Sequence, residues 1–434
     1  MKLFEFHSIS LEQKSNQRKS YDEIREIQCR KIQRIVKHAF ETVPYYNDLF
    51  KKNGIDPERI KSSDDLQIIP VSTKDDIINA GCRVISTMYR NSPLDIRRTG
   101  GSTGKTLSFY QSYRDGVYAA VSYDRARMEN GFDPSSDTIV FIGPFKDEII
   151  RQATLKARID FALKLRKQPV FIDMADNQQN IERLLMRNRY NSIKSYPSFF
   201  YALAHRIRSG MLKMPRIKHM FTASEVLDER TRDYINNTFN VDVKDIYGCW
   251  EGGCIGWECE KHEGYHTNID FVALQVLEDD TVSREHGKGN LILTNLNSYA
   301  VPFIRYQIND IVEVTSEHCS CGRPFPLIKS IAGRIDDFIK LTNGAKISPP
   351  GLLVVMHEFS ENVLEFQIIQ EKYDELNVRV VLAKSEDALR IKNDILSGLQ
   401  RHINDKKMKI SINAVSFIEK TRSGKHKSII SKIL

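Results

Sequence analysis

Two patterns of hydrophobic residues occur along the chain, and they predict helices and strands respectively. Over residues 20–55, apolar side chains recur at about i, i+3, i+4 and i+7 on a charged background, which predicts a helical segment. Pro44 and Gly54 punctuate the end of this segment. By contrast, residues 137–143 (DTIVFIG) form a short apolar run that stops at a glycine, which is typical of a buried strand.

Between residues 180 and 248, helical periods and short apolar runs follow one another. Helices are predicted over residues 180–190, 197–210 and 228–239, and strands over residues 217–225 and 241–248. Strands that alternate with helices of this length indicate an α/β body with parallel sheet.

The pattern changes twice more toward the C-terminus. Residues 265–315 hold alternating strand patterns separated by turn residues, so a β-rich segment is expected there. Residues 377–418 then follow the order strand, helix, strand. The prediction is therefore an α/β fold with a large N-terminal domain, residues 1–336, that contains parallel sheets and a β-rich subdomain. A small C-terminal α+β domain is expected over residues 337–434.

Composition narrows the class of protein. The 434 residues are 41% hydrophobic and 28% charged, which excludes a disordered or fibrous chain. No apolar run approaches 18 residues and the first twenty residues lack the features of a signal peptide, so we expect a cytoplasmic protein without a membrane partner. The net charge of +8 selects no partner class, and nucleic-acid binding is not expected because no basic block carries interleaved aromatics.

The seven cysteines are unevenly spaced. Five of them lie between residues 249 and 321. An odd number of cysteines without a secretion signal argues against a disulfide framework. This clustering favours a local metal site.

The segment TGGSTGKT (99–106) has the composition of a phosphate-binding loop. Glycines let the backbone N–H groups approach a phosphate, and hydroxyls and a lysine complete the anion site. A P-loop NTPase is disfavoured, and with it a kinase activity, because Thr99 stands where the required glycine would be. A flexible surface hairpin is the alternative. The candidate phosphate ligands are Thr99, Gly100, Gly101, Ser102, Thr103, Gly104 and Lys105.

This loop resembles the phosphate loop T-S-G-T-T-G-K-P of adenylate-forming enzymes, which include acyl-CoA synthetases, peptide-synthetase adenylation domains and luciferases. Gly100 and Thr106 depart from that pattern. Further motifs follow in the family's order. The resemblance implies ATP and AMP as ligands, and it implies that the small C-terminal domain is a mobile lid.

YGCWE (247–251) resembles the family's Y-G-x-T/S-E motif. By this resemblance, Tyr247 and Gly248 contact the nucleotide, with Tyr247 stacked on adenine, and Glu251 holds Mg²⁺, a cation that takes oxygen ligands. Trp250 replaces the usual Thr or Ser, which removes a hydroxyl. Upstream, Ser224 and Glu225 belong to a segment that resembles the lining of the adenine pocket. A solvated loop is the alternative for Glu251.

Three C-terminal motifs complete the resemblance. In RYQINDIV, Asp310 matches the carboxylate that binds both ribose hydroxyls, although Asn309 stands where glycine is usual. In GRIDDFIK, Arg334 is implied to meet ribose or phosphate, and Asp336 to be the hinge of the lid. In TRSGKHKS, Lys425 matches the catalytic lysine that stabilises the developing charge.

The branch of the family can be narrowed. Residues 43–77 and 196–204 resemble segments of phenylacetate–CoA ligases and capsular-polysaccharide adenylating proteins, and the resemblance covers about residues 40 to 434. It places aromatic residues near the pocket for the carboxylic acid, which suggests an aryl or apolar acid, although core packing explains them equally well. The candidates are Tyr196, Phe199, Phe200 and Trp250.

ECEKHEGYH and CSCGRPFP also resemble this branch, some of whose members bind zinc there. One histidine and three thiolates make a closed tetrahedral shell, which is the structural type of zinc site. The predicted ligands are Cys259, His266, Cys319 and Cys321, in a β-rich segment over about residues 254–332. His262, His318 and Cys254 are competing ligands, and four metal-free side chains are the alternative.

The resemblance implies that a carboxylic acid attacks the α-phosphate of ATP, with Mg²⁺, to give acyl-AMP and pyrophosphate. The acyl group then passes to an acceptor, with the thiol of coenzyme A as the first expectation. An amine, a hydroxyl or a carrier protein is the alternative acceptor. A non-catalytic, zinc-stabilised scaffold is the rival from another class, and a homodimer is left open.

Overall fold

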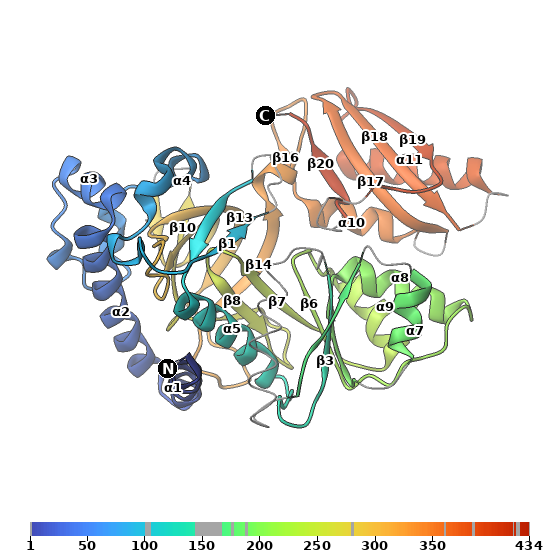
Figure 1. Cartoon of the computed structure of the whole chain (residues 1–434). Helices are drawn as coiled ribbons and strands as arrows, with labels where there is room; N and C mark the ends of the chain where they lie inside the picture. The colour runs from blue at the N-terminus through green and yellow to red at the C-terminus, as the bar shows by residue number, and fades with distance from the viewer. Residues whose placement is uncertain are drawn as a thin grey trace. The chain divides into compact units, whose positions relative to one another are not determined.

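The computed structural model describes residues 2–99, 106–143, 167–174, 178–186, 190–278, 282–359, 362–383, 387–419, 421 and 426–433 (Figure 1). These residues form two compact units. The first unit contains Met1–Thr138 and Lys244–Ile331, and the second contains Val170–Val243 and Ala332–Leu434 together with strand β3. Both units are therefore built from segments that are distant in the sequence.

Helices dominate the N-terminal part of the first unit. Three α-helices open the chain: α1 (Lys2–Asn16), α2 (Tyr21–Thr42) and α3 (Pro44–Lys52). The Ser20 side chain accepts a hydrogen bond from the Glu23 backbone N–H while the Glu23 carboxylate accepts one from Ser20 N–H, so a capping box fixes the start of α2. Its buried face packs on α3 in a core with Ile35, Val36 and Phe50.

A hairpin and a long helix follow. Short 3₁₀ helices occur at Pro57–Arg59, Asp65–Ile68, Gly81–Val84 and Thr87–Tyr89, with α4 at Lys74–Ala80. Strands β1 (Asp95–Arg98) and β2 (Ser108–Gln111) then pair antiparallel. Helix α5 (Tyr113–Met128) lies against β8, and α1 packs against α5 (Figure 1).

The remaining strands of the first unit form a largely antiparallel sheet segment in the order β11-β10-β12-β13-β14-β9-β8-β7. Their bounds are β7 Lys244–Cys249, β8 Gly253–Glu258, β9 Tyr265–Thr267, β10 Val272–Glu278, β11 Val282–Arg284, β12 Gly287–Asn295, β13 Tyr306–Thr315 and β14 Leu327–Arg334. A core that includes Ile255, Leu293 and Val312 lies between this sheet segment and α5. The predicted β-rich segment is thereby confirmed.

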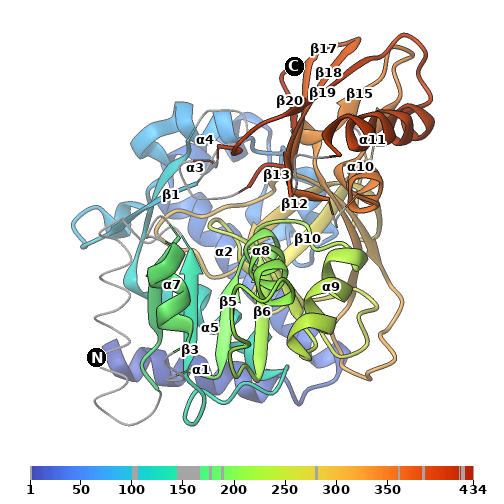
Figure 2. The same cartoon turned by 90° about the vertical axis from the view of Figure 1, so that its right-hand side faces the viewer.

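The second unit contains the parallel strands, in the order β4-β3-β5-β6. The strands are β3 Ile139–Gly143, β4 Val170–Asp173, β5 Ser192–Ser195 and β6 His219–Ala223. Helices α7 (Gln178–Leu185), α8 (Pro197–Arg208) and α9 (Glu229–Phe239) pack on them (Figure 2). Their shared core includes Ile193, Phe200 and Ile235.

The C-terminal segment of the second unit begins with the 3₁₀ turn η5 (Ile335–Asp337) and the small hairpin β15 (Ile339–Lys340) and β16 (Lys346–Ile347). A four-stranded sheet follows in the order β19-β18-β17-β20. Its elements are α10 Pro349–His357, β17 Val363–Lys372, β18 Glu375–Leu382, α11 Ala388–Ile403, β19 Lys409–Ala414 and β20 Ile429–Ser431. Apolar side chains of both helices and the sheet share one core.

The predicted α/β class, with its parallel strands and a C-terminal α+β segment, is confirmed. Predicted helices at residues 197–210 and 228–239 and the strand at 137–143 agree with the structure within about two residues, the usual uncertainty of element boundaries. Helices α1 and α5 were not predicted. Within the part of the chain that the structure describes, no helix has the length and apolarity needed to cross a membrane.

Candidate functional site

The glycine-rich segment that begins at Thr99 joins β1 to β2. Thr99 N–H donates to Leu107 O at 2.9 Å, which closes the base of this hairpin just beyond the paired strands. Residues Gly100–Lys105 lie outside the described residues. The two ends of the predicted phosphate loop therefore lie side by side, at the end of the β1–β2 hairpin.

Strands β7 and β13 bring two of the predicted nucleotide ligands together. Tyr247 Oη donates to Asp310 Oδ2 at 2.6 Å, and Asp310 is buried. The next residue, Gly248, has no room for a side chain, because a Cβ there would lie 2.4 Å from Gly253 O and 2.5 Å from Tyr123 Oη. Packing therefore requires glycine at position 248, directly after Tyr247.

Asn309 has a φ of 67°, in the left-handed region where glycine is favoured and asparagine is tolerated. This backbone conformation explains why asparagine serves where the resembled motif has glycine. The departure at this position therefore leaves the local geometry next to Asp310 intact.

Glu251 lies two residues beyond the end of β7. Its side chain is buried, and Tyr306 Oη donates to its Oε1 at 3.4 Å. Asn295 Nδ2 donates to the Glu251 backbone O at 2.7 Å. The alternative of a solvated loop glutamate is therefore wrong, and the carboxylate is held near the end of the strand.

Trp250 is exposed, whereas the next residue, Glu251, is buried: the exposed fraction of Trp250 is 49%. The guanidinium carbon of Arg97, on β1, lies 5.4 Å from the centroid of the Trp250 ring. Arg97 was not among the predicted site residues.

Ser224 and Glu225 follow β6 in the second unit. Ser224 has a φ of 74°, so the chain turns sharply there. The Glu225 carboxylate accepts hydrogen bonds from the backbone N–H groups of Ser198 and His426, each at 3.1 Å. Glu225 therefore ties the start of α8 to the residue that follows Lys425. Lys425 itself lies outside the described residues.

The predicted acid-pocket aromatics occupy different environments. Phe200 is fully buried in the core of the parallel sheet and its helices, and Phe199 is partly buried against the same core. Tyr196 precedes α8 and is buried, and burial, together with the charge of Glu225, raises its pKa. The Lys194 Nζ atom lies 5.9 Å from its ring centroid. Core packing accounts for Phe200, and the pocket role of the others stays a prediction.

Arg334 ends β14, and Asp336 lies in η5; both are half-buried. The neighbouring Asp337 forms an ion pair with Lys427, whose Nζ lies 3.4 Å from its Oδ1. Burial raises the pKa of Asp337, although Lys427 and Arg334 oppose this shift. The segment predicted as a hinge is thus joined to the segment that carries Lys425.

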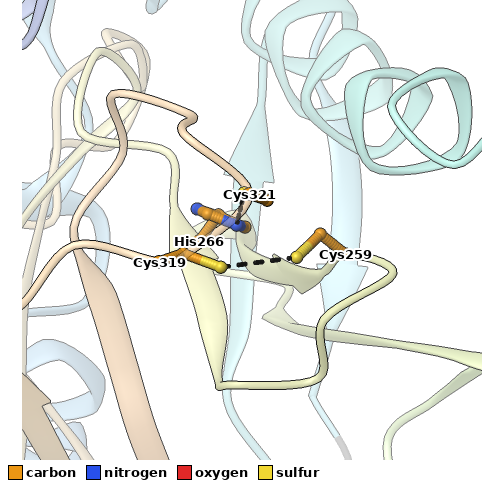
Figure 3. Close-up of side chains that lie close together, drawn as sticks. All are labelled: Cys259, His266, Cys319 and Cys321. Atoms are coloured by element: carbon orange, nitrogen blue, oxygen red, sulfur yellow. Dashed lines mark hydrogen bonds between the residues drawn. The ribbon is translucent and has the colours of Figure 1, made fainter.

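The four predicted zinc ligands meet at one place (Figure 3). Among the described residues, Cys259, His266, Cys319 and Cys321 form a group whose ligand atoms all lie within 4.8 Å of one another. The Sγ atoms of Cys259 and Cys319 are 3.6 Å apart, and Cys321 Sγ lies 3.3 Å from His266 Nε2. Tetrahedral zinc with Zn–S bonds of about 2.3 Å has sulfur atoms about 3.8 Å apart, so these separations suit that ion.

The histidine is oriented as a ligand. His266 Nδ1 lies 3.2 Å from Phe325 O, and an Nδ1–H donor to that carbonyl leaves the Nε2 lone pair facing the thiols. Burial lowers the pKa of His266, which favours the neutral imidazole. Burial alone would raise the pKa of Cys321, but hydrogen bonds from Arg323 bring it below the ordinary value. Three thiols and one imidazole, with ligand atoms within 4.8 Å of one another, therefore fit a soft cation such as zinc.

The competing ligands lie elsewhere. His262 Nε2 contacts Lys244 Nζ at 3.1 Å. His318 packs edge-on against Tyr21, with ring centroids 5.9 Å apart. Cys254 Sγ lies 3.6 Å from Gly256 O, and burial raises the pKa of this thiol to about 12. None of the three belongs to the four-residue group.

Two contacts in the site were missed by sequence reasoning. Tyr306 stands four residues before Asp310 in the same strand, and strand periodicity places such residues on one face, so this signal was available. The contact of Arg97 with Trp250 joins two segments that are distant in the sequence, so no local sequence pattern predicts it.

Comparisons with known proteins cover nearly the whole chain. The family model "CapK C-terminal domain" matches residues 339–432. Phenylacetate–coenzyme A ligase of Thermus thermophilus is 26% identical over 376 residues, which are 84% of this chain and 82% of that protein. Protein CapK of Staphylococcus aureus is 24% identical over 417 residues, 94% of this chain and 89% of that protein.

A solved structure supports the fold. The crystal structure of a 2-hydroxyisobutyryl-CoA ligase in the postadenylation state superposes with a TM-score of 0.78, at 20% identity, and covers 93% of this chain and 89% of that chain. At this identity the similarity establishes the fold.

Proposed function

We propose that the chain is an adenylate-forming enzyme, in the branch of phenylacetate–CoA ligases and CapK, and that it activates a carboxylic acid with ATP. The products are acyl-AMP and pyrophosphate, and the acyl group then passes to the thiol of coenzyme A. The observation that carries the proposal is the contact of Tyr247 with Asp310, which joins two motif segments.

In the proposed reaction, the Asp310 carboxylate accepts hydrogen bonds from the ribose hydroxyls, and Tyr247 contacts the adenine base. Glu251 holds Mg²⁺, and its partly desolvated carboxylate suits a hard cation. The loop from Thr99 to Lys105 binds the phosphates. Lys425 stabilises the charge that develops as the acid attacks. Arg334 would contact ribose or phosphate, and residues 337–434 would move as a lid about Asp336.

Zinc is proposed as a structural ion. Its ligands would be Cys259, His266, Cys319 and Cys321, which fill a tetrahedral shell without an open position for water. The ion would tie the turn after β8 to the segment before β14. All seven cysteines are free thiols. Because the cytoplasm keeps thiols reduced and so available as zinc ligands, we propose a cytoplasmic location.

ATP–pyrophosphate exchange tests the function. The protein is assayed against a panel of aryl, fatty, amino and hydroxy acids, and acyl transfer is then followed with and without coenzyme A. Exchange with one acid and thioester formation are expected. Light scattering on the same preparation tests for a homodimer.

Other outcomes are equally informative. Exchange without thioester would favour an amine, a hydroxyl or a carrier protein as the acyl acceptor. Binding of ATP without exchange for any acid would favour the non-catalytic scaffold.

A further inference from the structure

Arg97 occupies an unusual position in the first unit. It lies on β1, two residues before the glycine-rich loop, and its guanidinium faces the ring of Trp250 at 5.4 Å. Trp250 in turn directly precedes Glu251. Arg97 is therefore two residues from the candidate phosphate loop in the sequence, and its cation lies against the residue that precedes the candidate Mg²⁺ ligand.

The guanidinium is held firmly but is only partly neutralised. Its Nε donates to Gln111 Oε1 at 2.8 Å, and Gln111 is buried. A Cβ at Gly116 would come within 4.0 Å of Arg97 Nη2, so α5 closes one side of the group. The nearest carboxylate oxygen, on Asp95, is 3.9 Å from Nη2, which is the limit of an ion pair. Within the described part of the chain, Nη1 has no hydrogen-bond acceptor.

The surroundings of Arg97 favour the arrival of an anion. Its side chain is 15% exposed, so the charge is largely removed from water. Burial lowers the pKa of Arg97, and Asp95 offsets this only in part. An aromatic face stabilises a guanidinium while leaving its N–H groups free to donate. Arginine donates to phosphate oxygens in a fixed planar geometry.

We propose that Arg97 binds a phosphate oxygen of the adenine nucleotide, and that the Trp250 ring positions its guanidinium for this contact. The inference rests on the proposed function, because it assigns a further ligand to the same nucleotide. It also gives a role to Trp250, which replaces the hydroxyl residue of the resembled motif.

Nucleotide binding to the full-length protein tests the assignment. Isothermal titration calorimetry with ATP, AMP and adenosine compares the wild type with Arg97→Gln. The variant is expected to bind ATP about tenfold to a hundredfold more weakly, as for the loss of a charged hydrogen bond, and adenosine within about twofold of the wild type. Arg98→Gln is the matched control, since it removes the same charge from the exposed neighbouring position and is expected to leave all three affinities within about twofold.

Trp250 is tested in the same way. Trp250→Phe keeps an aromatic face and is expected to retain most of the affinity for ATP. Trp250→Ala is expected to weaken ATP binding, and the double variant Arg97→Gln/Trp250→Ala to be no worse than Arg97→Gln alone, because the two side chains act as a unit.

Three results would overturn the proposal. They are unchanged ATP binding by Arg97→Gln, an equal loss of ATP and adenosine binding, and additive losses in the double variant. If the wild type exchanges pyrophosphate but Arg97→Gln binds ATP normally, the Arg97 assignment alone fails. If the wild type binds no adenine nucleotide, the proposed function fails with it.

Discussion

Tyr247 Oη donates to Asp310 Oδ2 across 2.6 Å, and this bond joins β7 to β13. A short hydrogen bond to a buried carboxylate fixes the position of both oxygens before any ligand arrives. The contact makes the ribose-binding prediction for Asp310 directly testable.

Asp310→Ala is expected to weaken AMP binding by about 1.5–3 kcal/mol, the value of hydrogen bonds to a charged group. The loss should shrink when the ligand is 2′-deoxy-AMP, because that ligand has one hydroxyl fewer to lose. Calorimetric titration of both nucleotides measures the difference. Tyr247→Phe is the control that keeps the carboxylate. An equal loss for AMP and 2′-deoxy-AMP would contradict ribose recognition.

Glu251→Gln is expected to remove most of the Mg²⁺-dependent exchange activity, because the neutral amide is a poor ligand for a hard cation. The side chain keeps its size, so the contact with Tyr306 has a substitute acceptor. Exchange is measured over a range of Mg²⁺ concentrations, and higher Mg²⁺ should restore part of the rate. Tyr306→Phe serves as the control, with an expected change of less than about 1.5 kcal/mol. A Glu251→Gln rate with the wild-type Mg²⁺ dependence would remove Glu251 from the metal site.

Lys425→Ala is expected to abolish formation of acyl-AMP while the protein stays folded. Removal of even one neutral hydrogen-bond donor that is placed for the transition state costs about 10²–10³ in rate in other enzymes. Single-turnover formation of acyl-AMP measures the step, and circular dichroism checks the fold. Lys432→Ala is the matched control, since its ammonium pairs with Glu371 in an exposed position. A mutant that adenylates at the wild-type rate would show that another residue supplies this charge.

Cys319→Ser is expected to lose the bound zinc and to lower the melting temperature. The ligand group holds two separate segments together, and the binding energy of a structural zinc contributes to folding. Metal content by mass spectrometry and thermal unfolding measure the two effects. Cys82→Ser is the control, because Cys82 is exposed and lies outside the group. Retained zinc in Cys319→Ser, or an absence of zinc from the wild type, would refute the site.

The sequence predicted best those elements whose buried side chains are apolar and those sites whose residues lie close together in the chain. Helices such as α8 bury apolar side chains on one face, so their period is visible, and thiols with a histidine at short spacing identify a metal site. Helix α5 was missed because it buries Asp115, Asp124, Arg125 and Arg127, which look like surface residues in a sequence. Helix α1 likewise buries Gln13 and Asn16. Arg125 and Asn16 both bond to Asp270, which lies far along the chain, so no local pattern reveals these contacts.

Arg125 and Asp270 show what such a partner contributes. Both side chains are fully buried, and Arg125 Nη1 lies 2.6 Å from Asp270 Oδ1. Asn16 Nδ2 donates to the other carboxylate oxygen at 2.8 Å, which ties α1 to this pair. Burial alone would raise the pKa of Asp270, but the Arg125 guanidinium and its hydrogen bonds bring the pKa below the ordinary value. The pair therefore stabilises the fold when Asp270 is ionised.

Asp270→Asn is expected to destabilise the protein by about 3–5 kcal/mol near neutral pH, because it leaves Arg125 buried without a counter-ion. A carboxyl group with a lowered folded-state pKa contributes stability above its unfolded pKa of about 3.9, and this is lost as the pH falls through the folded value. The melting temperature of the wild type should thus fall more steeply below about pH 4 than that of Asp270→Asn. Arg125→Met/Asp270→Asn should be less destabilised than the sum of the single changes. Equal melting temperatures of Asp270→Asn and the wild type at pH 7 would show that the pair does not stabilise the fold.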